Sequence, residues 1–308
     1  MTAARPTLLD HSDAEAGRDV APTFPAPPAV RPRPTLGVVA IAHNEENDLP
    51  GFLENLLPWV DEIVIVDDGS TDRTSELARA AGPKVNFITA PRRAGEYYSH
   101  QRNKGIEAAR SDWLLHLDID ERVTPELAGE ILAAIQDDSK DGYRYRRLNF
   151  FLHRPMRGGG WQKWNLVHLA RREKFAFGGK MHETCLLDAT TDRIGQLRAP
   201  MWHLNDSDYA ERVRKNMTYM QVEADNLRER GVRVRWFHFL MHPLRRALQA
   251  YFLEGGFRDG TAGVLSALAV FTGTFNWYAT AWDRQNAIPR GELESRVKNL
   301  WREQGVKR

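Results

Sequence analysis

The sequence predicts an α/β fold with a mainly parallel central sheet that helices cover on both faces. Between Leu36 and Leu117, apolar and partly β-branched runs alternate with segments whose apolar residues recur at helical spacing. Polar residues also gather directly after three of these runs. Alternating strands and helices build parallel sheets, and 308 residues are ample for a full hydrophobic core.

The first 34 residues differ from the rest of the chain. They are rich in Pro and Ala, so we expect a disordered tail, with a docking arm as the alternative. The tail lacks the apolar segment of a signal peptide, and a single cysteine, Cys185, excludes an internal disulfide. Both features favour a cytoplasmic protein. Because 43 Lys and Arg nearly balance 41 Asp and Glu, no nucleic-acid partner is expected.

Four apolar runs predict the parallel part of the sheet, because continuous apolar runs are typical of strands that are buried on both faces. The predicted strands are residues 36–42, 62–66, 85–88 and 113–117, and the predicted helices between them are residues 48–60, 73–81 and 99–109.

Three polar clusters follow predicted strands: His43–Asn47, Asp67–Asp72 and Asp118–Glu121. In parallel sheets, ligands bind beyond the carboxyl ends of the strands. One strand that ends in acids is ordinary, but three such strands at one edge of a sheet predict a binding site.

Within the third cluster, Asp118 and Asp120 are two residues apart, so they point the same way on an extended chain. Two carboxylates on one side suit Mg²⁺ or Mn²⁺ and leave room for phosphate oxygens. The alternative is that these acids cap the helix that begins near Thr124.

The second half of the chain has a different pattern. Strands are predicted at residues 143–151, 166–171 and 174–177, polar turns at residues 178–183 and 201–204, and helices at residues 206–230 and from residue 290. The stretch Gly263–Trp282 is apolar but contains several Ser, Thr and Asn residues, so a buried or interfacial helix is preferred to a membrane span. The predicted division is a tail over residues 1–34, a site-bearing domain over residues 35–205 and a helical region over residues 206–308.

Three motifs follow one another along the chain: Ala42–Glu46 (AHNEE), Val66–Asp72 (VDDGSTD) and Leu117–Glu121 (LDIDE). Their composition, order and spacing resemble the successive signatures of family 2 glycosyltransferases with the GT-A fold. Later segments, among them Gly159–Trp161 and Phe252–Gly260, are similar to the lipopolysaccharide core β-glucosyltransferase subgroup.

The resemblance implies a nucleotide-sugar donor, a divalent metal ion and inversion at the anomeric carbon. It implies that Asp120 ligates the metal and that Asp118 contacts the ribose or the metal. A metal ion held there would neutralise the charge that develops on a diphosphate leaving group.

The resemblance also implies a pocket for the nucleotide. Asp68, with Asp67 beside it, resembles the acid that contacts the uracil or the ribose. Ala42, Asn44 and Glu45 resemble the wall of the pocket around the base and the ribose.

A positive charge near the donor phosphates is expected from Arg102, because a guanidinium offers a planar fork suited to phosphate. Arg92 and Arg93 are ranked below it. The alternative is that these side chains are ordinary surface charges.

Inversion needs a base that takes the proton of the acceptor hydroxyl. We predict Glu183, beside His182, although family 2 enzymes commonly show an Asp there; a structural ion pair is the alternative. By resemblance, His203 completes the metal site, and the alternative is a core or surface histidine. Trp161, Trp164 and His182 are candidates for contacts to the sugar or the acceptor, with core packing as the alternative for the tryptophans.

The sequence thus predicts an inverting hexosyltransferase that depends on Mg²⁺ or Mn²⁺. It moves a hexose from a nucleotide sugar, expected to be UDP-linked, to a hydroxyl of a glycan or glycolipid, as in lipopolysaccharide or cell-envelope glycan synthesis. A polyprenyl-phosphate sugar synthase and a non-catalytic nucleotide-sugar-binding protein are the alternatives. We expect a cytoplasmic protein with peripheral contact to the inner face of the cell membrane.

Overall fold

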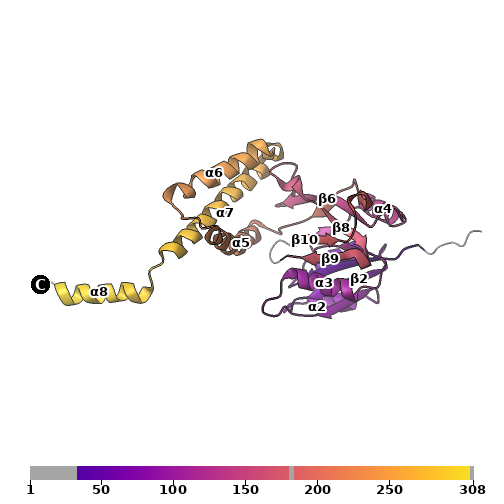
Figure 1. Cartoon of the computed structure of the whole chain (residues 1–308), viewed down its shortest axis with the longest axis horizontal. Helices are drawn as coiled ribbons and strands as arrows, with labels where there is room; N and C mark the ends of the chain where they lie inside the picture. Colours follow the sequence, from indigo (N-terminus) through magenta and orange to yellow (C-terminus); the bar gives the residue numbers. More distant parts are fainter. Residues whose placement is uncertain (1–32, 180–183, 306–308) are drawn as a thin grey trace, which may run out of the picture. The chain divides into compact units, whose positions relative to one another are not determined.

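Four parallel strands lie side by side at one end of the sheet in the computed structural model, which describes residues 33–179 and 184–305 (Figure 1, where β2 is labelled). Their order across the sheet is β3-β2-β1-β4. They are β1 (Leu36–Ala42), β2 (Glu62–Asp67), β3 (Val85–Thr89) and β4 (Trp113–His116). All four lie where apolar runs predict strands, so the predicted parallel sheet is confirmed.

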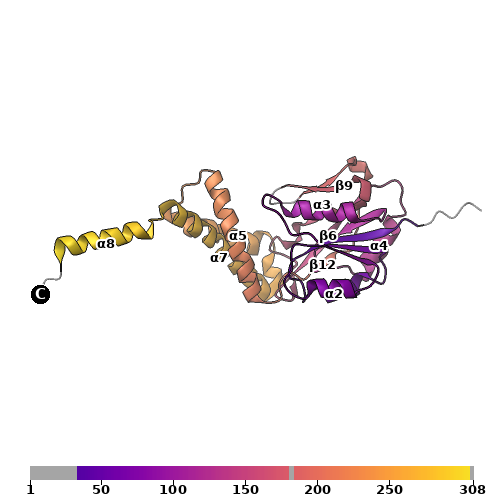
Figure 2. The same ribbon diagram turned by 90° about the horizontal axis from the view of Figure 1, so that it is seen from below.

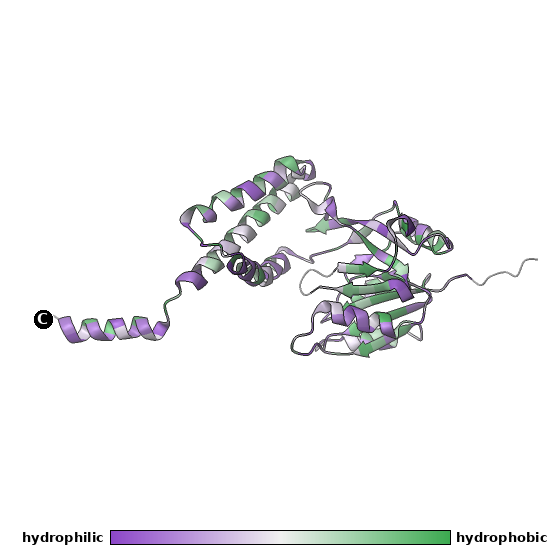
Figure 3. Cartoon of the chain, viewed as in Figure 1, coloured by the Kyte–Doolittle hydropathy of each residue, from purple (hydrophilic) through white to green (hydrophobic). Residues whose placement is uncertain are grey.

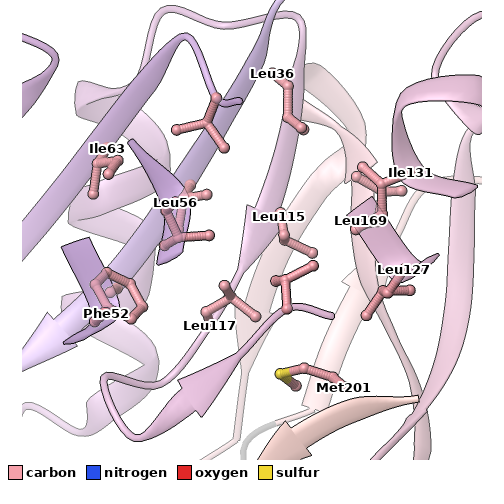
Figure 4. Close-up of a cluster of buried hydrophobic side chains, with 14 of the residues drawn as sticks. Leu36, Phe52, Leu56, Ile63, Leu115, Leu117, Leu127, Ile131, Leu169 and Met201 are labelled. Atoms are coloured by element: carbon pink, nitrogen blue, oxygen red, sulfur yellow. The ribbon is translucent and has the colours of Figure 1, made fainter. Parts of the chain in front are cut away.

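Helices cover both faces of this sheet. Its helices are α1 (Leu49–Leu56), α2 (Thr74–Ala80), α3 (Tyr98–Ala108) and α4 (Pro125–Ala134). α1, α2 and α4 pack on one face and α3 on the other, and Figure 2 shows α2 and α3 on opposite sides of the strands. Figure 4 shows Phe52 of α1 and Leu127 of α4 among the apolar side chains of one core cluster. Gly105 allows α3 to approach closely, because a Cβ there would lie 2.4 Å from Cγ1 of Val39.

Beyond β4 the sheet becomes mixed, in the order β4-β8-β6-β12-β5. The further elements are β5 (Glu121–Arg122), β6 (Gly142–Phe151), β7 (Arg154–Pro155), β8 (Asn165–Arg171), β11 (Ile194–Gln196), β12 (Met201–His203), and the short 3₁₀ helices η1 (Trp161–Lys163), η2 (Arg172–Lys174) and η3 (Thr191–Arg193). A separate hairpin contains β9 (Phe175–Gly178) and β10 (Thr184–Leu187). The predicted turn over residues 201–204 is wrong in part: Met201–His203 form a strand because they pair with both β5 and β6.

After β12 the described chain is helical. The elements are α5 (Tyr209–Glu229), η4 (Trp236–Phe239), α6 (Met241–Leu248), the π-helical turn η5 (Gln249–Leu253), η6 (Gly256–Asp259), α7 (Gly260–Asn286) and α8 (Arg290–Gln304). α7 packs against α5 and α6 and contains the predicted helix of residues 263–282. Figure 3 shows the mixed hydropathy of these helices.

Over residues 33–179 and 184–305, none of the helices combines the length and the apolar character that crossing a membrane requires.

The loop before η1 contacts the later helices. The carboxylate of Asp259 accepts hydrogen bonds from the N–H groups of Arg157 and Gly158, both at 2.8 Å. A Cβ at Gly158 would lie 2.1 Å from the carbonyl oxygen of Gly255, so only glycine fits there. From Pro34 onward the described chain forms one unit, and the predicted division at residue 205 stays a prediction. Residues 1–32 of the predicted tail lie outside the described residues.

Candidate functional site

The ends of β1, β2 and β4 meet at one edge of the sheet, which we call the site edge. Ala42 pairs with Asp67, and the N–H of Asp68 donates to the carbonyl of Ala42 at 2.8 Å. On the other side of β1, the N–H of Leu117 donates to the carbonyl of Val39 at 3.1 Å. These ladders bring the three polar clusters together.

Asp67 shapes the turn after β2. The residue is 2% exposed, and its carboxylate accepts hydrogen bonds from the N–H groups of Gly69 and Ser70, each at 3.2 Å, and from the Ser70 hydroxyl. Gly69 has a φ of +82°, which favours glycine. Asp67 therefore fixes the turn that presents Asp68, and its predicted direct contact with a nucleotide stays a prediction.

Asp68 pairs with Arg92, the arginine that sequence reasoning ranked below Arg102. Its carboxylate accepts from the N–H of Arg92 at 2.7 Å, from Nε of Arg92 at 2.6 Å and from Nε2 of Gln101 at 3.3 Å. Burial alone would raise the pKa of Asp68, but the hydrogen bonds and charge of Arg92 hold it below the ordinary value. Asp68 is therefore an ionised hydrogen-bond acceptor at neutral pH.

Asn44 joins the end of β1 to the turn after β2. It has a φ of +59°, a conformation that Asn tolerates, and its Oδ1 accepts from the N–H of Thr71 at 2.8 Å. The N–H of Glu45 donates to Oγ1 of Thr74 at 2.7 Å. Burial, with the charge of Asp120 nearby, raises the pKa of Glu45 to about 7. A cation bound at the site edge would favour the ionised form of Glu45.

Asp118 lies between two guanidinium groups. Its Oδ1 is 3.0 Å from Nη2 of Arg102, and its Oδ2 is 3.6 Å from Nη2 of Arg147. Burial opposes ionisation, but the two arginines hold the pKa of Asp118 far below its ordinary value. Nη1 of Arg102 also lies 2.7 Å from Nε2 of His116, a ring whose pKa burial and Arg102 lower well below the usual range. This part of the site therefore combines a fixed carboxylate with two fixed cations and a neutral imidazole.

Asp120 and His203 lie together at the same edge. β12 pairs with β5, and Nε2 of His203 is 3.0 Å from Oδ2 of Asp120. Nδ1 of His203 is 2.8 Å from Oδ1 of Asn149, whose Nδ2 donates to the carbonyl of Trp161 at 2.6 Å. Because that carbonyl requires the amide nitrogen, the amide oxygen faces His203 and Nδ1 carries the donated proton. Nε2 is then the ring nitrogen that can offer a lone pair to a cation shared with Asp120.

The spacing of this pair fits two ligands of one divalent cation. Two ligands at right angles, each about 2.1 Å from an octahedral ion, are about 3.0 Å apart. Oδ2 of Asp120 and Nε2 of His203 have that separation. In the part of the chain that the structure describes, no three His, Cys, Asp or Glu side chains form a metal cage. Mg²⁺ is usually held by one or two carboxylates together with substrate phosphates, so the carboxylate of Asp120 with one further ligand is a sufficient set.

The acids of the third cluster do not cap the helix that follows them. The N-cap of α4 is Thr124, whose hydroxyl accepts from the N–H of Leu127 at 3.2 Å. Glu121 instead fixes the acid-bearing turn, because its Oε2 accepts from the N–H of Asp118 at 3.0 Å and its other oxygen pairs with Arg147. Burial raises the pKa of Glu121 to about 8, against the opposing charge of Arg147.

Sequence reasoning missed Arg147, Asn149 and Lys215. Arg147 and Asn149 occupy inward positions of β6, and polar residues at inward positions of an alternating strand are the signal that could have found them. The guanidinium of Arg147 also lies 4.2 Å from the ring centre of Trp164, which packs against the core, and the predicted sugar contact of Trp164 stays a prediction. Lys215 of α5 lies close enough to Asp120 for that carboxylate to favour the charged form of Lys215, and the sequence carries no local signal for it.

The remaining predicted residues divide into two groups. His182 and Glu183, the predicted base, lie outside the described residues. Trp161 is described: its Nε1 donates to Oγ of Ser266 at 3.0 Å, and its ring lies 5.8 Å from that of Phe151. Trp161 also lines a cavity.

Comparisons with known proteins identify the family. The family described as glycosyl transferase family 2 matches residues 37–190. The lipopolysaccharide core biosynthesis glycosyltransferase LpsC of Rhizobium meliloti (strain 1021) is 30% identical over 264 residues, which are 81% of this chain and 92% of that protein. The uncharacterized glycosyltransferase RT0209 of Rickettsia typhi is 24% identical over 238 residues, which are 74% of this chain and 80% of that protein.

Among solved structures, the chain aligns with glucosyl-3-phosphoglycerate synthase from Mycobacterium tuberculosis in complex with Mn²⁺, uridine diphosphate and glucosyl-3-phosphoglycerate. The identity is 20%, the TM-score is 0.42, and the alignment covers 65% of this chain and 81% of that one. The strand order, the helices on both faces of the sheet and the family match are those of a GT-A fold. The chain is an enzyme that belongs to glycosyltransferase family 2.

Proposed function

We propose that the protein is an inverting, metal-dependent glycosyltransferase that moves a hexose from a UDP-sugar to a hydroxyl of a glycan or glycolipid in lipopolysaccharide or cell-envelope synthesis. The observation that carries this proposal is the Asp120–His203 pair at 3.0 Å, beside the Asp118–Arg102 pair, at the edge where three parallel strands end. The similarity to LpsC, a lipopolysaccharide core enzyme by its name, supports the acceptor class.

The donor nucleotide binds at the ends of β1 and β2 in this proposal. Asp68 is kept ionised by Arg92, so its carboxylate accepts hydrogen bonds from the ribose or the uracil. Ala42, Asn44 and Glu45 form the adjacent wall.

The donor phosphates lie at the end of β4. Asp120 and His203 hold Mg²⁺ or Mn²⁺, which when bound acts as a Lewis acid on the diphosphate leaving group. Arg102 and Arg147 keep Asp118 ionised for the ribose or the metal. Their guanidinium groups also add fixed positive charge where the leaving group develops negative charge.

Release of UDP from a panel of UDP-sugars tests the metal site. We expect release to require Mg²⁺ or Mn²⁺ and to stop with a chelator. Asp120→Asn should slow transfer about 10²- to 10³-fold, as the loss of one group that stabilises transition-state charge does. The control is Asp137→Asn, an exposed carboxylate just after α4. Unchanged transfer by Asp120→Asn would refute the metal site.

Glu183 is the base in this proposal, with His182 beside it near the acceptor. Glu183→Gln should reduce transfer by several orders of magnitude, because the acceptor hydroxyl must lose its proton. A polyprenyl-phosphate sugar synthase would keep nearly all its activity in this variant, since its acceptor phosphate is already ionised. A protein that only binds nucleotide sugars would bind UDP with metal and release none.

Residues 35–205 are the catalytic domain in this proposal, and residues 206–308 contact the inner face of the cell membrane peripherally from the cytoplasm. Large apolar side chains exposed on α6, η5 and η6 support the contact; we call them the apolar strip: Met241, Leu244, Leu248, Phe252, Leu253 and Phe257. Arg245 and Arg258 adjoin these residues in the sequence, and basic residues beside an apolar surface favour anionic lipid.

A further inference from the structure

A cavity lies between the β6–η1 segment and helices α5, α6 and α7. Its volume is about 150 Å³, and its walls include the aromatic rings of Phe151, Trp161 and Trp277. A cavity of about this size can hold one six-membered ring. The donor site at the strand ends uses none of these three side chains.

Small residues of α7 keep this space open. Ser266, Ala269 and Gly273 line the cavity at helical spacing. A Cβ built at Gly273 would meet no atom within 4 Å. Glycine lowers the stability of a helix relative to alanine, so the space beside Gly273 is kept together with a less stable helix.

One cation of the cavity is fixed by the fold. Nε of Arg212, on α5, donates to Oδ2 of the buried Asp206 at 2.8 Å. The guanidinium carbon of Arg212 lies 5.4 Å from the ring centre of Trp161. Arg212 therefore packs against the aromatic wall of the cavity, and the carboxylate of Asp206 already neutralises its charge.

The second cation, Arg246 of α6, has no such neutralising partner. Its guanidinium carbon lies 4.8 Å from the ring centre of Trp277, and among the described residues it forms no ion pair. Glu254 lies close enough to Arg246 for their charges to interact. However, Oε1 of Glu254 already forms an ion pair with Nζ of Lys163 at 2.5 Å. Arg246 therefore offers a guanidinium fork that suits a phosphate or a carboxylate.

The cavity adjoins the proposed metal ligands through one residue. Asn149 donates to the carbonyl of Trp161 at 2.6 Å and lies 2.8 Å from His203, which lies 3.0 Å from Asp120. The backbone of Trp161 is therefore joined to Asp120 by two hydrogen-bonded residues, Asn149 and His203.

We propose that this cavity binds one sugar ring of the acceptor, stacked on Trp161 and Trp277, and that Arg246 binds an anionic group on that ring. Aromatic rings supply a flat apolar surface for the ring, and the amide of Asn216, also in the lining, supplies hydrogen bonds to hydroxyls. The anionic group is a phosphate or a carboxylate. This inference rests on the proposed transfer to a glycan, because only that reaction requires an acceptor sugar here.

Titration of the full chain with glucose 6-phosphate, glucuronate and glucose, followed by ligand-observed NMR, tests the binding. We expect at least one of the two anionic sugars to bind about tenfold or more tightly than glucose, as a charge-assisted hydrogen bond adds. The two anionic probes distinguish phosphate from carboxylate. Equal binding of all three sugars, or binding of none, overturns the proposal.

Two variants locate the binding. Gly273→Leu should fill the cavity and abolish sugar binding, whereas Gly129→Leu should not. Gly129 is a matched control, because it lies within α4 and a Cβ there also meets no atom within 4 Å. Arg246→Gln should bring the anionic sugars to the affinity of glucose, and Arg246→Lys should keep part of the difference. Anionic-sugar binding unchanged in both Gly273→Leu and Arg246→Gln overturns the proposal, and Arg246→Gln decides alone if Gly273→Leu does not fold.

UDP binding with Mn²⁺, measured on the same samples, separates this inference from the proposed function. Wild type that binds UDP but none of the sugars refutes the cavity site and leaves the donor site intact. Wild type that binds an anionic sugar through Arg246 but no UDP refutes the proposed function and, with it, the acceptor role of the cavity, while the binding of an anionic sugar there stands.

Discussion

Asn149 sets the orientation of His203 at the site edge. Its amide nitrogen is used by the carbonyl of Trp161, so its oxygen holds the proton on Nδ1 of His203. Groups that orient a metal-ligating histidine typically affect metal affinity 10- to 100-fold. We therefore expect Asn149→Leu to weaken Mn²⁺ binding, measured by calorimetry with UDP present, by about that factor.

Two further variants separate orientation from general damage. Asn149→Asp keeps an oxygen toward Nδ1 and should retain more affinity than Asn149→Leu. Asn165→Ala removes a hydrogen bond of 3.0 Å to Gln196 on β11 and should leave Mn²⁺ binding unchanged. If Asn149→Leu bound Mn²⁺ as wild type does, the orientation argument would be wrong.

At the scale of residues, the position of a side chain at the site edge could be predicted where the information is contiguous in the sequence. Asp68, Asp118 and Asp120 stand in short motifs that follow strands, and the structure places all three at one edge. The contact between Asn149 and His203 joins residues 54 positions apart, through the pairing of β6 with β12. No local pattern specifies that register, so the partner of His203 could not be predicted from the sequence.

At the scale of elements, a buried carboxylate ties β6 to the short helices beside it. Asp141, whose side chain is 1% exposed, accepts from Nη2 of Arg193 at 2.8 Å and from Nζ of Lys174 at 2.6 Å. These hydrogen bonds, Arg193 first, hold the pKa of Asp141 well below its ordinary value. Asp141→Asn should lower the free energy of unfolding at pH 7 by about 2–3 kcal/mol, below the usual range for a broken buried pair because both cations reach water. Urea denaturation measures this.

The ion pairs of Asp141 also predict how the free energy of unfolding depends on pH. Because the pKa of Asp141 is lower in the folded state, the unfolded chain takes up the proton first as pH falls. The contribution of Asp141 to the free energy of unfolding is therefore present above about pH 4, and it is lost progressively as the pH falls below that value. The stability curves of wild type and Asp141→Asn should converge toward pH 2. As a control, Asp138→Asn removes an exposed pair with Arg171 and should change stability by less than about 0.5 kcal/mol. Parallel curves at all pH values would contradict this account.

The sequence predicted elements in proportion to their length. Strands β1, β2 and β6 are long enough for a continuous or alternating apolar pattern to be visible. β5 and β12 have two and three residues, too few for any periodicity, and they are strands only because of their partners. Those short strands complete the site edge, so the least predictable elements are at the centre of the proposed chemistry.

At the scale of the whole molecule, bulk charge gives no indication of a partner, whereas the distribution of apolar side chains does. The apolar strip contains Leu253, which is 83% exposed, and Phe252, which is 60% exposed. Exposed apolar surfaces beside basic residues mark interaction sites, and we propose a lipid surface here. We expect the full chain to sediment with vesicles that contain anionic phosphatidylglycerol more than with vesicles of neutral phosphatidylcholine, because each basic residue near an anionic surface adds about 1 kcal/mol.

The double variant Phe252→Ser/Leu253→Ser should reduce vesicle binding about tenfold or more, since two large apolar side chains no longer enter the interface. Leu166→Ser/Leu186→Ser is the matched control, because both leucines are exposed but lie on β8 and β10. High salt screens the arginines but not the apolar contact, so wild type should keep part of its binding in 0.5 M NaCl, a concentration at which the Debye length is only about 4 Å. If vesicle binding disappeared in salt and were the same in both double variants, the attraction would be purely electrostatic. The apolar strip would then have no role in vesicle binding.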